Sequence, residues 1–363
     1  MRAAVLYEPN SPLRVEEVTL DEPQAEEVLV RIVAVGVCHT DLHVIKGDIP
    51  VPMPVVLGHE AGGIVEKAGP CVATLQPGDH VVLMAVFSCG KCRHCAAGKP
   101  SLCPTFLTSL VTGALPSGGK RLHKDGQELS HFFAQASFAE YAVVHERTAV
   151  KIRGDAPLET VCLLGCGVST GVGAAINAAG IRAGESIVIY GCGGVGLSAV
   201  MGAKMAGASK IIAVDVLDRK LQMAKELGAD DVINASQENP TQRVIELTGG
   251  ADYAIECIGN LDVIAQAVSS IRYGGKCVLV GTSPPGSALS VSPNEFVVMG
   301  KTLTGCLQGS IVPSIDVPKY VDWYMEGTLP IDKLITRNYS LDGINEAFEA
   351  LEKGETIRSV IRI

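Results

Sequence analysis

The chain has 363 residues, of which 47% are hydrophobic and 19% charged, with 40 glycines and a formal net charge of −9. This is the composition of a compact globular protein with enough chain for two domains, and it argues against a disordered or fibrous protein. The acidic balance, with a pI near 5.4, excludes the basic surface by which proteins bind nucleic acid.

The N-terminal stretch MRAAVLYEPNSPLRVEE has no long apolar core and no small-residue cleavage site, so we do not expect a secretory signal. Two uncharged stretches, TVCLLGCGVSTGVGAAINAAGI and SIVIYGCGGVGLSAVMGA, are interrupted by glycines. We expect both to be buried core and not membrane spans. The 12 cysteines are then expected to be ligands, catalysts or buried fillers in a reducing compartment, the cytoplasm.

Short apolar runs separated by turns, such as VLVRIVAVGVC, GGIVEKAG and GDHVVLM, predict a mainly β region over the first part of the chain. Within it, residues 98–130 are rich in turn-forming residues and predict a long surface loop. From Glu159 onward, strand-like and helix-like segments alternate, which predicts a doubly wound parallel sheet. The chain from Asp316 predicts two amphipathic helices and a final strand.

Four cysteines lie close together in the β region: Cys89, Cys92, Cys95 and Cys103. Their C-x-x-C spacing brings thiolates within reach of one tetrahedral ion, and four thiolates leave no position for water or substrate. A disulfide, a redox pair and an iron–sulfur cluster are the alternatives. A redox pair needs only two of the four, and nothing else in the sequence points to electron transfer. We therefore expect a structural zinc that holds together a loop with little hydrophobic core of its own.

A dinucleotide-binding pattern, G-x-G-x-x-G, is formed by Gly191, Gly193 and Gly196 between an apolar strand and a helix-like stretch. The glycines allow a tight turn, close approach to a pyrophosphate at the helix N-terminus, and close packing of the helix. Asp215 ends the next predicted strand, where a carboxylate accepts hydrogen bonds from the ribose and repels a 2′-phosphate. We therefore expect NAD and not NADP, with Lys220 helping to hold the ribose. The alternative is that the glycines serve only packing.

A second metal site is suggested by Cys38, His59 and Cys166, which come from the separate stretches GVCHTDLH, LGHEAGG and LLGCGVSTG. Two thiolates and one imidazole leave a fourth position open, as a catalytic zinc requires. Spacing alone does not establish that the three converge. Taken singly, a cysteine such as Cys166 is more often a buried core thiol, and a histidine such as His59 is more often a satisfied core histidine.

In this order, GHEAGGIVEKAG, the clustered cysteines, GCGVSTG and GCGGVGLS resemble the zinc-dependent alcohol dehydrogenases of the medium-chain dehydrogenase/reductase superfamily. The resemblance covers essentially the whole chain, including the final GETIRSVIRI. It implies an α/β protein with a GroES-like, mainly β catalytic domain at residues 1–167 and 308–363. An inserted Rossmann domain at residues 168–307 would bind NAD, with the active site in the cleft between the domains.

The resemblance also implies roles for single residues. Cys38, His59 and Cys166 would bind the catalytic zinc, giving two zinc ions per subunit with the structural one. Thr40 would receive the alcohol proton, and His43 would form the outer end of the proton relay. The other implied residues are Asp41, which orients the histidine ligand; Glu60, a catalytic-site carboxylate close to the metal; His39 and Arg358 at the pyrophosphate; Thr170 and Val195 beside the nicotinamide; and Gly191, Gly193, Gly194, Gly196, Asp215 and Lys220 elsewhere along the cofactor.

Simpler interpretations exist for some of these residues. His43 can be an ordinary exposed histidine, Asp41 a loop cap, and Glu60 a purely structural carboxylate. We expect His94 and His145 to be surface residues without a role.

The implied reaction transfers a hydride between a small-molecule alcohol and NAD, giving an aldehyde and NADH. Ala85 stands where many relatives acting on primary alcohols carry an aromatic pocket residue, so a methyl group there leaves more room. Other candidate pocket residues are Ile49, Leu102, Phe132 and Phe133. We therefore expect bulky or aromatic primary alcohols as substrates. The resemblance further implies a homodimer, built by sheet extension near KCVLVGT and KTLTGCLQGS. The alternatives are a tetramer and a monomer whose edge strand is covered by the C-terminal tail.

Two other functions are open. A glutathione-dependent formaldehyde dehydrogenase (S-hydroxymethylglutathione dehydrogenase) would need a basic residue near the start of the long loop. That region reads CPTFLTSLVTG, and Lys120 and Arg121 come later. A non-catalytic zinc- or dinucleotide-binding relative would be expected to have lost catalytic ligands, but all of them are present here.

Overall fold

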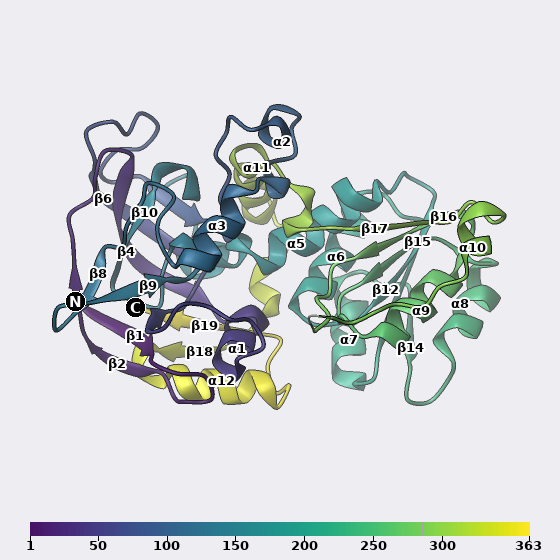
Figure 1. The fold of residues 1–363 in the computed structure, drawn as a ribbon. Helices are drawn as coiled ribbons and strands as arrows, with labels where there is room; N and C mark the ends of the chain where they lie inside the picture. Colours follow the sequence, from purple (N-terminus) through teal and green to yellow (C-terminus); the bar gives the residue numbers. More distant parts are fainter. Residues whose placement is uncertain (285) are drawn as a thin grey trace. The chain divides into compact units, whose positions relative to one another are not determined.

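The computed structural model describes residues 1–284 and 286–363. The chain forms two compact units, one of Met1–Gly167 with Val312–Ile363 and one of Val168–Ile311. Both chain ends, purple and yellow in Figure 1, therefore belong to the first unit.

Two sheets build the first unit. One has the strand order β2-β1-β5-β9-β8-β3, and the other has the order β11-β7-β6-β4-β19-β18, with β10 also pairing with β4. Strand β4 alternates buried and partly exposed residues over much of its length, and its buried side chains enter the main apolar core of the unit. The strands are β1 (Arg2–Leu6), β2 (Arg14–Glu17), β3 (Thr19–Leu20), β4 (Glu27–Gly36), β5 (Val55–Val56), β6 (Ala61–Ala68), β7 (His80–Leu83), β8 (Leu122–Lys124), β9 (Gln127–His131), β10 (Tyr141–His145), β11 (Ala149–Lys151), β18 (Ile335–Ser340) and β19 (Arg358–Arg362).

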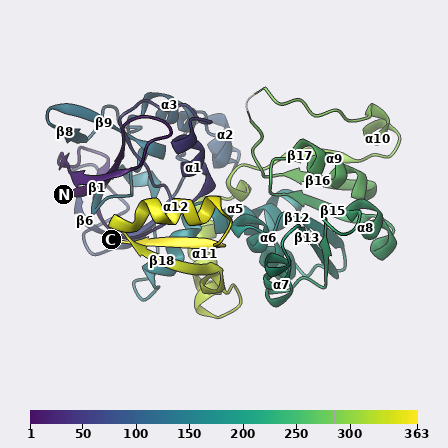
Figure 2. The ribbon, with the colours of Figure 1, turned by 90° about the horizontal axis from the view of Figure 1, so that it is seen from below.

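The C-terminal strand β19 lies antiparallel beside β4, with Val360 opposite Gly36. This pairing carries the last residues of the chain next to segments from its first third. Helix α12 packs on β18 and β19, as Figure 2 shows. The helices of this unit are α1 (His39–Lys46), α2 (Arg93–Ala96), α3 (Thr105–Thr112), α4 (Leu158–Val161), α11 (Pro313–Met325) and α12 (Ile344–Glu352). Its 3₁₀ turns are η1 (Pro100–Leu102), η2 (Phe132–Ala134), η3 (Glu146–Thr148), η4 (Cys162–Gly165), η7 (Ile331–Leu334) and η8 (Leu341–Gly343).

The prediction of a plain surface loop at residues 98–130 is wrong, because this segment contains helix α3 and the β8–β9 hairpin. Helix α3 forms because Phe106 buries on one face, and it ends at Gly113 in the left-handed conformation. The hairpin turns at Asp125 and Gly126, which both have positive φ values, 50° and 82°. An Asp-Gly pair of this kind is the preferred two-residue hairpin turn.

The second unit contains one six-stranded parallel sheet with the order β14-β13-β12-β15-β16-β17. The order reverses between β12 and β15, so the predicted doubly wound sheet is confirmed. The strands are β12 (Ser186–Tyr190), β13 (Lys210–Asp215), β14 (Asp231–Asn234), β15 (Ala251–Glu256), β16 (Ile271–Leu279) and β17 (Thr302–Gly305). The helices are α6 (Gly194–Met205), α7 (Asp218–Leu227), α8 (Pro240–Thr248), α9 (Leu261–Ser270) and α10 (Pro293–Val297), with the π-helix η5 (Ala174–Ala179) and the 3₁₀ turn η6 (Gln308–Ser310).

Helix α5 (Gly167–Gly173) begins at the last residue of the first unit and continues into the second. In the described part of the chain, no single helix has both the length and the apolar composition needed to cross a bilayer. One bent pair, Leu158–Gly165 with Gly167–Ala179, meets these criteria only when its two helices are taken together.

Candidate active site and metal centres

His59 lies at the centre of a group of buried polar side chains in the first unit. It is fully buried, and its Nδ1 lies 3.1 Å from Oδ1 of Asp41 in the first turn of α1. The same oxygen accepts the backbone N–H of Gly58 at 3.0 Å. Asp41 therefore fixes the imidazole with its proton on Nδ1. The buried Nε2 has no hydrogen-bond partner among the described residues, which is the arrangement of a histidine that ligates a metal.

Cys38, His59 and Cys166, which the sequence placed in three separate stretches, come together in the first unit. Their ligand atoms and a carboxylate oxygen of Glu60 all lie within 4.8 Å of one another. Cys38 precedes α1, and Cys166 lies between η4 and α5, so turns and helix starts supply the thiols. Two thiols, one imidazole and a nearby carboxylate are a donor set that zinc accepts. These residues therefore fit the metal that the sequence pattern implies.

The electrostatics of this group favour a bound cation. The hydrogen bond from Cys166 holds the pKa of the Cys38 thiol well below its ordinary value, and the charge of His59 acts in the same direction. Burial alone would lower the pKa of His59, but the charges of Asp41 and Cys38 outweigh burial and raise it. Negative charge thus accumulates around the imidazole, where positive charge is stabilised.

Glu60 is held by a cationic partner from the other end of the chain. Nη2 of Arg358, at the start of β19, donates to Oε2 of Glu60, and the backbone N–H of Gly167 donates to Oε1 at 3.2 Å. Both side chains are buried. Burial raises the pKa of Glu60 to about 7, although Arg358 acts to lower it. The partner that the structure gives Arg358 is thus a carboxylate, and its contact with a pyrophosphate stays a prediction.

The proton-relay candidates lie at the start of α1. Thr40 Oγ1 is 3.6 Å from the sulfur of Cys38, so the hydroxyl lies next to the metal-ligand group. His43 lies one turn further along α1, is partly exposed, and has Nδ1 2.9 Å from Oδ2 of Asp48. His39 lies at the surface, at the first position of α1.

An aromatic pair borders the metal-ligand group. The ring of Phe133 stacks on the imidazole of His59, with centroids 4.8 Å apart, and Phe132 meets it edge-on at 5.6 Å. Ala85 is buried, and Ile49 is partly buried in the same core cluster as Phe132. Leu102 is 51% exposed, so its role as a pocket residue stays a prediction.

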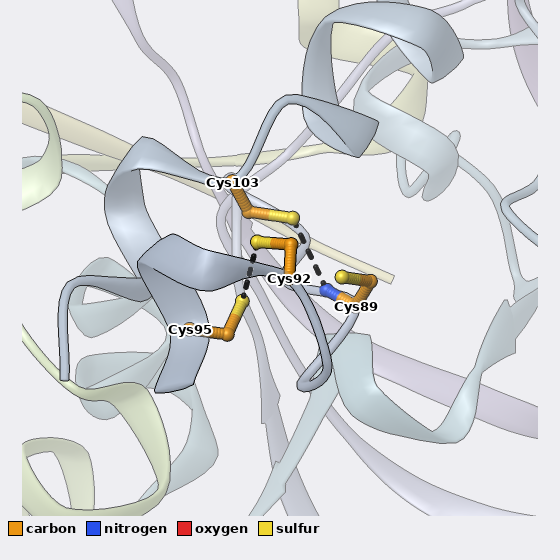
Figure 3. A group of neighbouring side chains, drawn as sticks. All are labelled: Cys89, Cys92, Cys95 and Cys103. Atoms are coloured by element: carbon orange, nitrogen blue, oxygen red, sulfur yellow. Dashed lines mark hydrogen bonds between the residues drawn. The ribbon is translucent and has the colours of Figure 1, made fainter. Parts of the chain in front are cut away.

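The four clustered cysteines surround one point, as Figure 3 shows. Their sulfur atoms lie within 4.8 Å of one another. The sulfurs of Cys92 and Cys95 are 3.5 Å apart, and the backbone N–H of Cys89 donates to the sulfur of Cys103 at 3.3 Å. The backbone N–H of Lys91 lowers the pKa of Cys89 to about 6, whereas burial raises the pKa of Cys95 to about 12, so without a cation the cluster favours the thiolate at Cys89 and the thiol at Cys95. All twelve cysteines of the chain are free thiols. The cluster therefore fits a tetrahedral structural zinc.

The glycine motif of the second unit has the geometry that a pyrophosphate needs. Gly191 follows β12 with φ of 91°, a value that disfavours a side chain. A Cβ on Gly196 would lie 1.7 Å from the carbonyl oxygen of Gly191, so helix α6 packs here only with glycine. A Cβ on Gly193, at the N-cap of α6, would meet open space, where an anion can approach the helix N-terminus. Gly194 and Val195 form the first turn of α6, and Thr170 lies buried in α5.

Asp215 is positioned at the end of β13 by three backbone donors. Its Oδ2 accepts the N–H of Cys192, inside the glycine motif, at 2.8 Å. Its Oδ1 accepts from Val216 and Leu217 at 2.8 and 3.0 Å. The carboxylate is thereby fixed beside the glycine turn, and its contact with a ribose hydroxyl stays a prediction. Lys220, in the first turn of α7, is partly buried.

In the first unit, nothing in the sequence indicated that several residues would be buried near the metal-ligand groups. His145 is buried, accepts the N–H of Arg147 on Nδ1 at 3.1 Å and meets the ring of Phe87, so the expectation of a surface residue is wrong. Gln135 is buried and donates to the carbonyl oxygen of His59 at 3.2 Å. Phe106 packs on Phe133. Only the spatial proximity of distant segments reveals these contacts.

Two family models match the chain. The model of the alcohol dehydrogenase GroES-like domain matches residues 24–154, and that of zinc-binding dehydrogenase matches residues 194–326. The chain is 40% identical to S-(hydroxymethyl)glutathione dehydrogenase of Paracoccus denitrificans over 99% of both chains. It is 41% identical to alcohol dehydrogenase class-3 of Drosophila melanogaster, over 99% of this chain and 97% of that one. It is also similar to the structure of benzyl alcohol dehydrogenase from Acinetobacter calcoaceticus, with a TM-score of 0.96 and 40% identity over 100% of this chain and 99% of that one.

Proposed function

The chain belongs to the zinc-dependent alcohol dehydrogenases, enzymes that use NAD, and on this premise we propose that it oxidises bulky or aromatic primary alcohols to aldehydes. The observation that carries this proposal is the aromatic pair at the candidate metal ligand, where Phe133 stacks on His59 and Phe132 meets its edge. Apolar rings there favour an apolar or aromatic substrate over a charged one. The buried methyl of Ala85 supports the same choice, because a small side chain in a pocket wall leaves room for a larger substrate.

The proposed mechanism assigns each polar group one task. Zinc held by Cys38, His59 and Cys166 would supply a Lewis acid that lowers the pKa of an alcohol hydroxyl. Thr40, 3.6 Å from the sulfur of Cys38, would receive the hydroxyl proton. His43 would then pass the proton to solvent, oriented by Asp48 at 2.9 Å.

On the cofactor side, Gly191, Gly193 and Gly196 would admit the pyrophosphate, and Asp215 would accept a hydrogen bond from a ribose hydroxyl. Asp215 is fixed for this by the N–H of Cys192. Its negative charge would also disfavour a cofactor with a 2′-phosphate.

Oxidation of S-(hydroxymethyl)glutathione is the second candidate, because the Paracoccus denitrificans relative, 40% identical to this chain, is an S-(hydroxymethyl)glutathione dehydrogenase. Benzyl alcohol dehydrogenase is 40% identical as well, so overall identity does not separate the two substrates. The contacts of Arg121 favour an alcohol substrate over the glutathione adduct. Its guanidinium donates to both carboxylate oxygens of buried Glu27, at 3.0 and 2.7 Å, and also donates to the carbonyl oxygen of Gly118. Held in this way, it is poorly placed to bind the carboxylates of a glutathione adduct.

The test is the rate of NADH formation from benzyl alcohol, ethanol and S-(hydroxymethyl)glutathione, measured on protein whose zinc content is known. Turnover highest with benzyl alcohol and two zinc ions per subunit are the expected results. A higher kcat/KM for the glutathione adduct would replace the proposal with the second candidate.

We further propose a homodimer formed through the second unit. Strand β17 ends the six-stranded sheet and, among the described residues, pairs only with β16. Exposed apolar side chains lie in the same unit: Tyr273 is 66%, Val297 82% and Val298 68% exposed. An open strand edge and apolar side chains together favour pairing with a second copy. Light scattering should give twice the chain mass, and Val297→Asp should shift it toward the monomer. A tetramer or a wild-type monomer would contradict the dimer.

The cytoplasm is the proposed compartment, since twelve free thiols and two thiolate sites are best preserved where disulfides are kept reduced. Fractionation that places the protein in an oxidising compartment would contradict this assignment.

A further inference from the structure

The segment that covers the imidazole of His59 has an uncommon backbone. Phe133, Ala134 and Ala136 have φ values of 52°, 55° and 61°, in the left-handed region that residues with a side chain rarely adopt. Such conformations persist where the surrounding structure enforces them, and they concentrate at functional sites. The question is therefore which contacts hold Phe133 in the conformation that stacks its ring on His59.

One of these contacts comes from inside the same segment. Gln135 lies between Ala134 and Ala136, is fully buried, and donates from Nε2 to the carbonyl oxygen of His59 at 3.2 Å. This bond fixes the backbone of His59 relative to the segment. It does not touch the ring of Phe133, so it leaves the stacking itself unexplained.

Two rings contact the ring of Phe133 directly: that of its neighbour Phe132, edge-on at 4.4 Å, and one from helix α3. Phe106 is 8% exposed, and its ring lies 5.2 Å from the ring of Phe133 at an angle of 40°. The rings of Phe106, Phe133 and His59 thus form a continuous series from α3 to the imidazole.

The outer end of this series is anchored at the four-cysteine loop. The backbone N–H of Phe106 donates to the carbonyl oxygen of Cys103 at 3.3 Å, and Cys103 belongs to the cysteine cluster. A zinc ion in that cluster would fix the position of Cys103 and therefore the start of α3. Phe106 thus links this loop to the ring of Phe133, which stacks on His59.

We propose that Phe106 is a positioning residue for the reaction: through Phe133 it fixes the ring plane of His59 and ties this metal ligand to the four-cysteine loop. Asp41 sets the tautomer of His59 at Nδ1, whereas a stacked ring limits the tilt of the imidazole plane by rotation about the Cβ–Cγ bond. A metal ligand whose plane is restrained binds its ion with less reorganisation. The inference rests on the proposed function only in taking His59 as a ligand of the catalytic metal.

The test uses Phe106→Leu, which removes the ring and keeps an apolar side chain. The matched control is Phe348→Leu, because Phe348 is also buried and meets another ring, that of Phe138 at 5.9 Å, but has no ring contact with His59 or Phe133. The wild type and both variants are prepared with Co²⁺ at the site of Cys38, His59 and Cys166. The readouts are the visible absorption of Co²⁺, which reports ligand geometry, and the rate of metal release to a chelator.

We expect Phe106→Leu to shift the Co²⁺ bands and to speed metal release by about tenfold, the lower end of what loss of an outer partner of a metal ligand costs. Phe348→Leu should reduce thermal stability and leave both readouts at the wild-type values. If Phe106→Leu does not fold, Phe106→Met gives the same test, since it also lacks the ring.

Unchanged bands and an unchanged release rate in a folded Phe106 variant would overturn the inference and leave the proposed function intact. A wild-type protein that binds Co²⁺ only at the four clustered cysteines would overturn both, so the two failures are distinguishable.

Discussion

Arg358 and Glu60, 298 positions apart in the sequence, form a buried ion pair beside the candidate catalytic metal ligands. The pairing of β19 with β4 brings them together, because it places the start of the last strand next to the end of β4. The pair connects the C-terminal segment of the first unit to the residue that follows His59. It gives a structural reason why the first unit contains both ends of the chain.

Arg358→Met should therefore destabilise the protein by about 3–5 kcal/mol, because it leaves a buried carboxylate without its partner. Urea unfolding of the wild type and the variant measures this difference. The control is Arg337→Met, which removes an exposed pair with Glu355 and should cost no more than about 1 kcal/mol. An equal loss of unfolding free energy in the two variants would show that the buried pair stabilises the protein no more than the exposed pair does.

Cys95→Ser should remove one zinc ion per subunit and lower the free energy of unfolding by more than about 4 kcal/mol, in the range where losses of metal sites fall. The described cluster has four cysteines and a tetrahedral zinc takes four ligands, so no spare ligand of the cluster can replace Cys95. Elemental analysis and thermal unfolding give both values. Cys71→Ser, which changes an exposed thiol outside both clusters, should retain the wild-type zinc content. A Cys95→Ser protein with undiminished zinc would refute the structural site.

Thr40→Val should lower kcat by about 10²-fold or more, since the variant keeps the shape of the side chain and loses the hydroxyl that would receive the proton. The effect should appear in kcat more than in KM. Thr40→Ser retains a hydroxyl near the sulfur of Cys38 and should keep most of the activity. Similar rates for the Val and Ser variants would exclude Thr40 from the proton relay.

His131 predicts a specific pH dependence of stability. Its buried imidazole accepts the N–H of Arg121 at 3.0 Å, and burial lowers its pKa to about 4 from an ordinary 6.5. Between these values the unfolded chain binds more protons than the folded one, so the free energy of unfolding falls as the pH drops from about 6.5 toward about 4. Removing this histidine should weaken that fall.

The comparison of wild type with His131→Gln isolates this contribution. Between pH 7.5 and pH 5 the wild type should lose about 2 kcal/mol more than the variant, as follows from proton linkage of a single group. Chemical unfolding at the two pH values measures it. Parallel losses in both proteins would show that His131 does not titrate as described.

The sequence predicted the features that depend on short, contiguous patterns. The glycine motif, the four cysteines and the alternating segments of the second unit each carry their geometry in local spacing, and the structure places them accordingly. The D-G pair at Asp125 and Gly126 was also a local signal, and reading it as a hairpin turn would have corrected the predicted loop.

The contacts that the sequence did not reveal join segments far apart in the chain. The pair of Arg358 with Glu60 depends on strand pairing, and the stacking of Phe133 on His59 depends on a left-handed backbone at a residue that disfavours it. The burial of His145 is a third example, because this histidine at the end of β10 packs against Phe87, a residue from a distant segment. Tertiary packing decides such positions, and no local propensity encodes them.

The most direct test of the proposed substrate class is the ratio of kcat/KM for benzyl alcohol to that for ethanol, in the wild type and in Ala85→Phe. A roomy apolar pocket predicts a preference for benzyl alcohol of about 100-fold or more, and filling it at Ala85 should reduce that ratio at least about tenfold. A wild-type preference for ethanol, or a ratio that Ala85→Phe leaves unchanged, would contradict the account.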